Sequence, residues 1–410
     1  MKLLVIGHNY YPELTGIGKY TSEFCSFLAE KEGHSVQVIT AYPHYPQWKI
    51  AEGYRHRWFN SERIQGVKVL RVPIYVPANP SGFKRLLMDA FFILNAFIAL
   101  NYLLLVKRRK FDYIFTPVPF FALGLLGLYY RFFSRKTKVL YHIQDLQIDA
   151  ADNLGLIKNK QLLGLLRSVE RFILQHVDHV STISDGMQRK VLAKSSKLKE
   201  CLLFPNWINN KNIHVITPKP VIHKDNLAGK RIILYSGAIG EKQGLEIIIE
   251  AARHFAAYQN DFVFIISGEG PYKEKLIADA AAHGLTNVLF YNLLPIDAFN
   301  ELLNAAFLHL VIQKESGSDL FLPSKLTNIL GIGGQVIVTA TNGTSLYKIL
   351  QDHQCGVLIE PMNIGELIDA ITRLADNKEL RAALSANALS YSDAFLNQRS
   401  VIDNYIVQVA

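Results

Sequence analysis

Two glycine-rich turns in the second half of the sequence could hold a phosphate group. Residues 236–244 have the sequence SGAIGEKQG and residues 267–271 have SGEGP, and each turn follows a short apolar run. A helical pattern follows each turn, so backbone N–H groups at a helix N-terminus would meet the anion, and a lysine would neutralise its charge. Neither turn has the GxxxxGK[ST] or GxGxxG spacing, which disfavours an ATPase and a dinucleotide dehydrogenase. The candidate phosphate-binding residues of the two turns are Gly237, Lys242, Gly268, Glu269 and Gly270.

A third segment places a lysine where a predicted helix begins. Residues 319–328 have the sequence DLFLPSKLTN, with Ser324 and Lys325 in the first turn and Asn328 one turn later. A helix N-terminus with a lysine suits a diphosphate. A solvated lysine on a surface helix would have the same pattern, and this alternative stays open.

A similar turn, TGIG at 15–18, lies between the first predicted strand and the first predicted helix. Gly16 and Gly18 would let backbone N–H groups approach an anion at the helix N-terminus. A plain tight turn would also use glycine here.

Three polar residues end an apolar strand in the first half of the chain. In the sequence YHIQD at 141–145, strand alternation puts His142 and Gln144 on one face and Asp145 at the strand end. Polar side chains are costly to bury without partners, so these three residues are candidates for contacting a reacting group. A locally satisfied structural cluster is the alternative.

The elements that would position these residues alternate between apolar runs and helical patterns. In an open α/β sheet, ligands bind beyond the carboxyl ends of the strands, which is where these candidate segments lie. Two βα series in one chain predict two tandem Rossmann-like domains. The predicted strands are 2–7, 35–40, 67–72, 113–116, 139–144 and 179–183, and then 231–237, 262–268, 335–340 and 356–361.

The domain boundaries follow from a lapse in this pattern. Residues 209–230 lose periodicity and contain two prolines and mixed charge, as is typical of a linker or loop. We therefore expect an N-terminal domain at 1–208 and a C-terminal domain at 209–385. The helical segment 386–410 could pack back onto the first domain.

Composition narrows the class of protein. The chain has 410 residues, 50% of them hydrophobic and 19% charged, which excludes a disordered polyampholyte. Its net charge of +9 favours an anionic partner: phosphate, nucleic acid or an acidic membrane surface. The lysines are dispersed, so nucleic acid is not expected. Three scattered cysteines indicate a reducing compartment and neither a zinc site nor a disulfide framework, and the N-terminus lacks a signal-peptide pattern.

One segment is unusually apolar. Residues 86–106 are interrupted by Asp89, Asn95 and Asn101. A basic pair at 84–85 precedes them, and a run of four basic residues at 107–110 follows them. A buried core helix, a helix lying on a membrane surface and a membrane span all remain possible.

The sequence around these turns resembles the GT-B fold glycosyltransferases of family 4, and within them the bacterial colanic acid glycosyltransferases of the fucosyltransferase type. The resemblance covers residues 11–330 in order. Its motifs are YPELTGIGKYT (11–21), VITAYPHYPQW (38–48), HIQDLQIDA (142–150), VDHVSTIS (177–184), FPNW (204–207), ILYSGAIGEKQGLEIIIEAA (233–252) and LPSKLTNIL (322–330).

The resemblance implies an α/β enzyme of two domains with a cleft between them and a C-terminal helix that crosses back. Such an enzyme transfers a sugar to a lipid-linked saccharide in exopolysaccharide synthesis, and the fucosyltransferase type implies fucose from GDP-fucose. It retains anomeric configuration and needs no metal or other cofactor, in keeping with the absence of a DxD motif. Its partners would be the nucleotide sugar, the saccharide and the inner face of the cell membrane, to which it would attach peripherally.

The resemblance also implies roles for the candidate residues. The second domain would bind the donor through Gly237, Lys242, Ser324, Lys325 and Asn328, with the 268–270 turn near the base or ribose. In the first domain the 16–18 loop would close over the donor phosphates. His142, Gln144 and Asp145 would face the transferred sugar.

Two positions depart from the family pattern. A ribose-binding glutamate falls on Asn328, with its companion near Leu320, and the usual phosphate-turn arginine falls on Ala238. An amide accepts a hydrogen bond more weakly than a carboxylate does. A binding or scaffold protein with weakened activity, and a nucleotide-sugar epimerase of the same architecture, are therefore alternatives.

Overall fold

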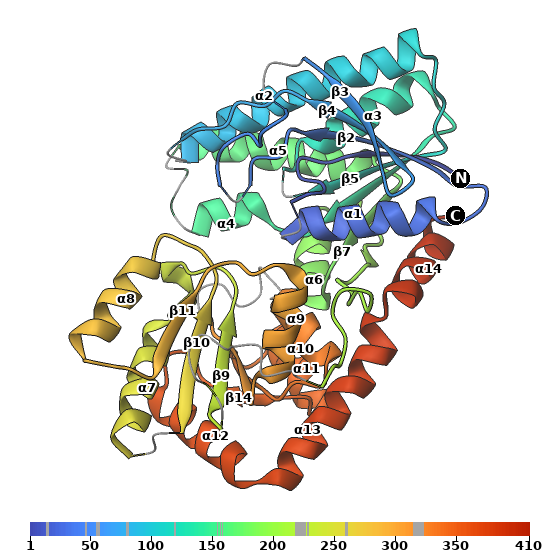
Figure 1. The fold of residues 1–410 in the computed structure, drawn as a ribbon. Helices are drawn as coiled ribbons and strands as arrows, with labels where there is room; N and C mark the ends of the chain where they lie inside the picture. The colour runs from blue at the N-terminus through green and yellow to red at the C-terminus, as the bar shows by residue number, and fades with distance from the viewer. Residues whose placement is uncertain are drawn as a thin grey trace. The chain divides into compact units, whose positions relative to one another are not determined.

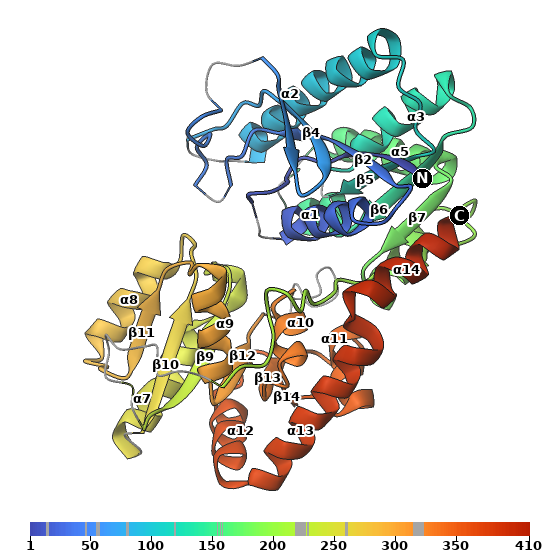
Figure 2. The same cartoon turned by 45° about the vertical axis from the view of Figure 1, so that its right-hand side comes forward.

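The computed structural model describes the chain except for residues 14–15, 46, 55–57, 79–81, 119, 154, 156, 158, 218–226, 228, 259–260 and 315–323. The chain forms two compact units. Unit 1 comprises Met1–Pro205 together with Ile402–Ala410, and unit 2 comprises Asn206–Val401. Figures 1 and 2 show one sheet flanked by helices in each unit.

Unit 1 is built on a sheet of eight strands in the order β3-β4-β2-β1-β5-β6-β7-β8. All neighbours pair in parallel except β3 and β4, which are antiparallel. The strands are β1 (Lys2–Ile6), β2 (Ser35–Ala41), β3 (Asn60–Ile64), β4 (Val67–Val72), β5 (Tyr113–Val118), β6 (Lys138–Ile143), β7 (His179–Thr182) and β8 (Leu202–Leu203). The helices are α1 (Gly16–Ala29), α2 (Gly82–Asn101), η1 (Tyr102–Val106), α3 (Leu123–Phe133), α4 (Gln147–Asn153), α5 (Lys160–His176), α6 (Asp185–Ala193) and the end of α14 (Gln398–Val409).

The C-terminal helix contributes to the core of unit 1, as the fold prediction expected. Tyr405 of α14 stacks on Phe204, with ring centroids 3.9 Å apart and an interplanar angle of 9°. The Lys31 ammonium pairs with the Asp403 carboxylate, and Lys138 Nζ donates to the Ala410 carbonyl oxygen at 2.9 Å.

Unit 2 is built on a parallel sheet of six strands in the order β11-β10-β9-β12-β13-β14. Its strands are β9 (Arg231–Ser236), β10 (Phe262–Ser267), β11 (Val288–Tyr291), β12 (Leu308–Val311), β13 (Val336–Thr339) and β14 (Val357–Ile359). Its helices are η2 (Glu241–Gln243), α7 (Glu246–Tyr258), α8 (Lys273–Ala282), α9 (Ile296–Ala305), α10 (Ser324–Gly331), α11 (Ser345–His353), α12 (Ile364–Asp376), α13 (Lys378–Tyr391) and η4 (Ser392–Leu396).

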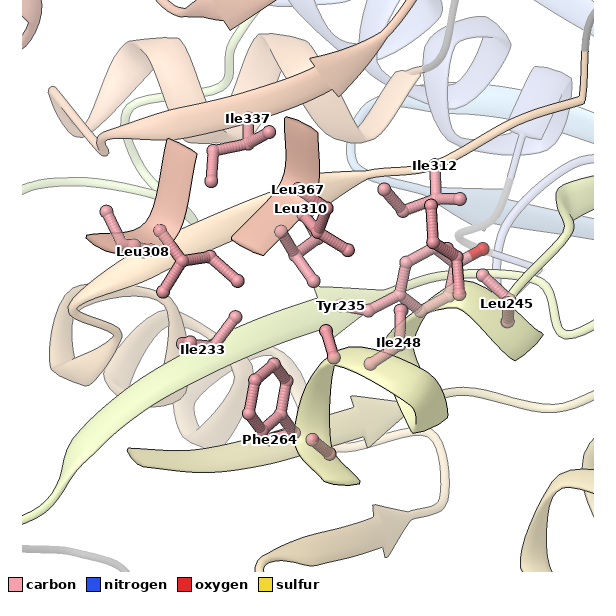
Figure 3. Close-up of a cluster of buried hydrophobic side chains, with 14 of the residues drawn as sticks. Ile233, Tyr235, Leu245, Ile248, Phe264, Leu308, Leu310, Ile312, Ile337 and Leu367 are labelled. Atoms are coloured by element: carbon pink, nitrogen blue, oxygen red, sulfur yellow. The ribbon is translucent and has the colours of Figure 1, made fainter. Parts of the chain in front are cut away.

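Each face of the second sheet has its own apolar core. On one face, Ile233 and Phe264 of the strands meet Ile248 of α7 and Leu367 of α12, as Figure 3 shows. On the other, Leu326 and other residues of α10 pack with α9 and α11. Helix α12 illustrates why these segments are helical. Leu367, Ala370, Ile371 and Leu374 recur at helical spacing on its buried face, and the Asn363 side chain caps its N-terminus by accepting from Glu366 N–H.

The predicted fold class is confirmed: the chain contains two Rossmann-like α/β units. The predicted strands are all present, but four short ones were missed, and their compositions explain why. Strand β3, NSERI, is polar and partly exposed, β8 has two residues, and β11 and β12 have four residues each. Runs this short give too few alternations to distinguish a strand from a loop or a helix.

The apolar segment predicted at 86–106 forms α2 and η1, which pack one face on the first sheet. Met88, Phe92, Ala96 and Leu100 are buried there, and so are the two polar interruptions Asp89 and Asn95. Within the stretch Lys84–Val106, the most apolar window of 18 residues has a mean hydropathy of 1.9, enough for a membrane span by length and composition, and 33% of that window is buried. The helix therefore has one face buried against the sheet and another exposed face, unlike a core helix that is buried on all sides.

Candidate functional site

The candidate residues of unit 2 meet where the strand order of its sheet reverses. Strand β9 lies between β10 and β12, and the chain leaves β9 toward α7 and β12 toward α10, on opposite faces of the sheet. Such a reversal leaves a crevice at the carboxyl ends of the two strands. Gly237 follows β9, and a Cβ at this position would lie 3.1 Å from Lys325 Nζ of α10. The turn and the lysine therefore belong to one site.

The two glycine turns pack directly on each other. Gly237 N donates to the Ser267 carbonyl at 2.9 Å, and Ile239 N donates to the Glu269 carbonyl at 2.9 Å. A Cβ on Gly268 would lie 1.8 Å from the Gly237 oxygen, and one on Gly270 would lie 2.1 Å from the Ile239 oxygen. Any side chain at either position would push the turns apart.

Lys325 lies beside the Gly237 turn with an aromatic ring as its neighbour. Its Nζ is 3.8 Å from the centroid of the Tyr235 ring, whose hydroxyl donates to the Ala238 carbonyl at 2.7 Å. Among the described residues, no carboxylate lies within ion-pair distance of this ammonium. Burial lowers the pKa of Lys325 to about 7. An anion bound beside Gly237 would restore the charged form, because an opposite charge close by raises a lysine pKa.

The other predicted donor-binding residues of unit 2 lie on the glycine turns and on α10. Lys242 is exposed in η2, and its carbonyl accepts from Lys314 N–H at 3.2 Å. Glu269 is half-exposed, with its Oε1 3.8 Å from Lys273 Nζ. Ser324 begins α10, and Asn328 is partly buried one turn later in the same helix. Residues 319–323, which include Leu320, and Thr15 of the first-domain turn lie outside the described residues.

Sequence reasoning missed Lys273, which fixes the second glycine turn. Its buried Nζ donates to the carbonyls of Gly268 at 3.0 Å and Tyr291 at 3.1 Å, and to Asn292 Oδ1 at 2.6 Å. These acceptors end β10 and β11, so the lysine ties two strand ends together. A lysine in the first turn of a helix has the pattern of a solvated residue, and no signal in the sequence marked it.

His142 has a structural role. It was expected to face the transferred sugar, but its side chain is buried in unit 1. The side chain is 1% exposed, and Nδ1 lies 3.0 Å from Ser181 Oγ, which in turn lies 3.2 Å from the Tyr405 hydroxyl. Its ring packs between Phe115 and Phe204, and burial lowers its pKa to about 3. The alternative of a locally satisfied structural cluster describes this histidine.

Gln144 and Asp145 follow β6 at the carboxyl edge of the first sheet, where both are partly buried. They remain candidates for contacting a ligand there. Gly16 begins α1 with φ of +53°, and a Cβ there would meet no described atom within 4 Å. Gly18 is different, because a Cβ would lie 2.4 Å from the Glu13 carbonyl oxygen. Packing therefore explains Gly18, whereas Gly16 leaves space for a ligand.

A buried glutamate, also missed in the sequence, organises the loops at this edge. Glu13 Oε1 accepts from the backbone N–H groups of His44 at 2.5 Å and Tyr45 at 2.7 Å, and its Oε2 accepts from Asn9 Nδ2 at 2.8 Å. One carboxylate thus joins the loop after β1 to the loop after β2. Within the described residues, no group of three or more His, Cys, Asp or Glu side chains is placed to hold a metal ion.

Comparison with known proteins gives matches in both halves of the chain. Residues 15–207 match the family model of the glycosyl transferase 4-like domain, and residues 219–390 match that of glycosyl transferases group 1. The chain is 38% identical over 99% of both chains to WcaI of Escherichia coli (strain K12), a glycosyl transferase named for colanic acid biosynthesis.

Solved structures resemble the whole chain in fold. Sucrose-phosphate synthase of Thermosynechococcus elongatus matches with a TM-score of 0.73 and 16% identity, over 99% of this chain and 97% of that one. HepE of Anabaena, in complex with UDP and glucose, matches with a TM-score of 0.70 and 13% identity, over 100% of this chain and 99% of that one.

We predict that Lys325→Ala weakens the binding of a nucleotide-diphosphate sugar. A hydrogen bond to a charged group contributes about 1.5–3 kcal/mol, so the donor KM should rise about ten- to a hundredfold, or turnover should be lost. Steady-state kinetics with a saturating acceptor measure this change. Lys378→Ala, which removes an exposed lysine at the start of α13, is the control and should leave the kinetics unchanged. Unchanged kinetics in Lys325→Ala would remove this lysine from the site.

We also predict that donor affinity depends on the protonation of Lys325. Since burial places its pKa at about 7, the ammonium is present below that pH and is lost above it. The dissociation constant of an intact nucleotide sugar, whose own charge does not change in this range, should rise about tenfold between pH 6 and pH 8. Calorimetric titration measures it. Lys325→Met should bind weakly at every pH, and a wild-type affinity that is flat across this range would contradict the prediction.

Proposed function

The chain belongs to the group 1 glycosyl transferases of family 4, and from that premise we propose that it transfers a sugar from a nucleotide-diphosphate donor to a lipid-linked saccharide. We further propose that the pathway is exopolysaccharide synthesis of the colanic acid type, with GDP-fucose as the donor and retention of anomeric configuration. The similarity over the whole chain to WcaI supports the pathway.

The position of Lys325 beside Gly237 is the observation that supports the donor site most directly. Breaking the bond between sugar C1 and the diphosphate oxygen leaves a departing dianion and a sugar with oxocarbenium character. A lysine ammonium and the N–H groups of the α10 N-terminus would stabilise the dianion as its charge develops. The enzyme would thus supply positive charge from its own side chains at the leaving group.

Ala238, which replaces the usual arginine, fits this assignment. Its carbonyl accepts from the Tyr235 hydroxyl, and the face of the same tyrosine ring lies under the Lys325 ammonium. The tyrosine thereby links the turn to the lysine. We propose that Lys325 supplies the charge that the arginine supplies in the family.

We predict that an intact nucleotide sugar stabilises the protein against heat. At a concentration a hundred times Kd the stabilisation is about 2.7 kcal/mol, which should raise the melting temperature by roughly 5 °C. A panel of GDP- and UDP-sugars measured by thermal shift would identify the base and the sugar, and Lys325→Ala is the matched control that should lose the shift.

The outcomes of this panel separate the two parts of the proposal. A shift with UDP-sugars alone would overturn GDP-fucose and leave the transferase in place. No shift with any nucleotide sugar would favour a protein without donor binding.

We propose that unit 1 attaches to the cytoplasmic face of the membrane through its exposed apolar residues. On α2, Leu87, Phe91, Leu94 and Ile98 recur at helical spacing and are between 43% and 56% exposed. The neighbouring helix α3 packs against α2 through Tyr129, whose hydroxyl donates to Asn101 Oδ1 at 2.7 Å. The apolar patch consists of exposed apolar residues of α2, η1 and α3, namely Leu87, Phe91, Leu94, Ile98, Leu105, Val106, Phe132 and Phe133.

Basic residues at both ends of α2 and η1 support a bilayer as the occupant of this patch. Lys84 and Arg85 precede it, and the run 107–110 follows it, and all of these residues are exposed. Each cation near an anionic bilayer contributes about 1 kcal/mol, and the apolar side chains add burial in the interface. A helix with one face packed on its own sheet would lie along the membrane surface rather than cross it.

We predict that changing the four basic residues at 107–110 to glutamate releases the protein from membranes. Losing about 4 kcal/mol of attraction should reduce binding to vesicles of 30% anionic lipid by about a thousandfold. Vesicle flotation measures this change. Lys197→Glu with Lys199→Glu, two exposed positions of unit 1 outside the apolar patch, is the control and should stay bound. Continued binding of the 107–110 variant would place the contact elsewhere.

A further inference from the structure

At the carboxyl edge of the first sheet lie buried polar atoms for which the described residues offer no hydrogen-bond partner. His8 follows β1 and is 7% exposed, with Nδ1 3.2 Å from Asn9 Oδ1. Its Nε2 is buried, has no hydrogen-bond partner among the residues that the structure describes, and lies 3.9 Å from Asp89 Oδ1 of α2. Native proteins satisfy nearly all buried polar groups, so an unused ring nitrogen here points to a ligand that supplies the partner.

Asp89 and Gln147, from two other elements, form with His8 a cluster of polar side chains, the polar cluster. Asp89 is 7% exposed, and the side chain of Gln147, which begins α4, lies near enough to lower the pKa of its carboxyl. The amide oxygen Gln147 Oε1 is buried and has no hydrogen-bond partner in the described part of the chain. Burial lowers the pKa of His8 to about 3 and raises that of Asp89 to about 7. A neutral imidazole and a partly protonated carboxyl suit a neutral hydroxyl-bearing ligand better than an ion.

Two aromatic rings on the loop after β2 lie beside the polar cluster. The rings of Tyr45 and Trp48 lie 6.2 Å apart, with Tyr45 41% exposed and Trp48 partly buried. The His44 ring connects the two parts, 5.2 Å from His8 and 6.4 Å from Trp48. The Arg85 guanidinium lies 5.0 Å over Trp48.

Glu13 anchors this loop through the backbone of His44 and Tyr45, so the aromatic rings are held in place rather than left on a free loop. A sugar has an apolar C–H face and a rim of hydroxyls. A ring platform beside a few fixed polar groups matches both features, as ligand sites generally combine apolar walls with few orienting polar atoms.

We propose that His8, Asp89 and Gln147, with Tyr45 and Trp48, form the subsite that binds the saccharide of the acceptor. This acceptor subsite rests on the proposed function and assigns its second substrate to named side chains. The rings stack on the sugar, while the unpaired His8 Nε2 and Gln147 Oε1 receive its hydroxyls. These residues bind and orient the acceptor, and none of them takes part in bond breaking.

Helix α2 explains why a lipid-linked saccharide fits this place. Asp89 faces His8 of the polar cluster from the inner side of the helix, while Leu87 and Phe91 on the outer side belong to the apolar patch. A helix is about 10 Å across, so the inner and outer faces of α2 are separated by a distance that a saccharide headgroup spans. The lipid would remain in the bilayer while its sugar reaches the subsite.

A binding experiment that needs no activity tests the subsite. The probe is the oligosaccharide released by mild acid from a membrane lipid extract of a colanic-acid-producing bacterium, observed by saturation-transfer NMR on the full chain. Wild type and Tyr258→Ala, which removes an exposed tyrosine of unit 2, should give equal signals. Trp48→Leu and the isosteric Asp89→Asn should reduce them about fivefold or more. No signal with wild type, or equal signals in all variants, would overturn the proposal.

Kinetics then distinguish acceptor binding from a merely structural effect. In Asp89→Asn the amount of lipid extract giving half-maximal transfer should rise about tenfold, with the donor KM and the slow hydrolysis of donor without acceptor unchanged. Glu170→Gln, which alters a buried carboxylate paired with Lys194, is the control and should change stability alone. An equal loss of donor hydrolysis in Asp89→Asn would show a structural role and overturn the subsite.

Failure of the proposed function would look different from failure of the subsite. Absence of donor hydrolysis and of transfer in wild type would reject the transferase. The NMR signals would still decide whether the saccharide binds at Trp48 and Asp89.

Discussion

The contact between the two glycine turns of unit 2 sets the geometry on which its site depends. Because Gly268 has no side chain, its backbone comes close enough to Gly237 for the turns to exchange hydrogen bonds. The Gly237 turn is thereby held at the carboxyl end of β9, against the Lys325 ammonium. Tyr235 serves both parts, since its hydroxyl binds the turn and its ring lies under the lysine. A side chain at Gly268 would therefore displace the phosphate turn and the cation relative to each other.

The architecture could be predicted from the sequence because parallel sheets impose strong local patterns. Buried strands are continuous apolar runs, such as FVFIIS of β10, and the helices between them repeat their apolar residues at helical spacing. The site turns were found for a related reason, since glycines after a strand are hard to explain unless the backbone must come close to something. Lys273 was not found, because only the tertiary fold brings the ends of β10 and β11 within reach of its ammonium.

His142 shows where such reasoning fails. Strand alternation correctly placed it on the face opposite Tyr141, but the elements that cover this face come from elsewhere in the chain. Phe204 follows β8 and Tyr405 lies in the C-terminal helix, and together with Ser181 they enclose the ring. A single strand contains no information about what will cover it. A polar residue at a strand end is therefore ambiguous between a site and a core until its distant neighbours are known.

The two units share one feature that separates binding groups from structural ones. Lys273 and Glu13 are buried and fully used by protein atoms, which stabilises the loops they join. Lys325 is drawn out of water against an aromatic ring, and His8 keeps a buried nitrogen to which no described residue donates or accepts a hydrogen bond. Burial of an unsatisfied polar group costs free energy that a folded chain selected for stability alone would avoid. A ligand that completes these groups recovers that free energy on binding, so the instability of the empty sites becomes affinity for the substrates.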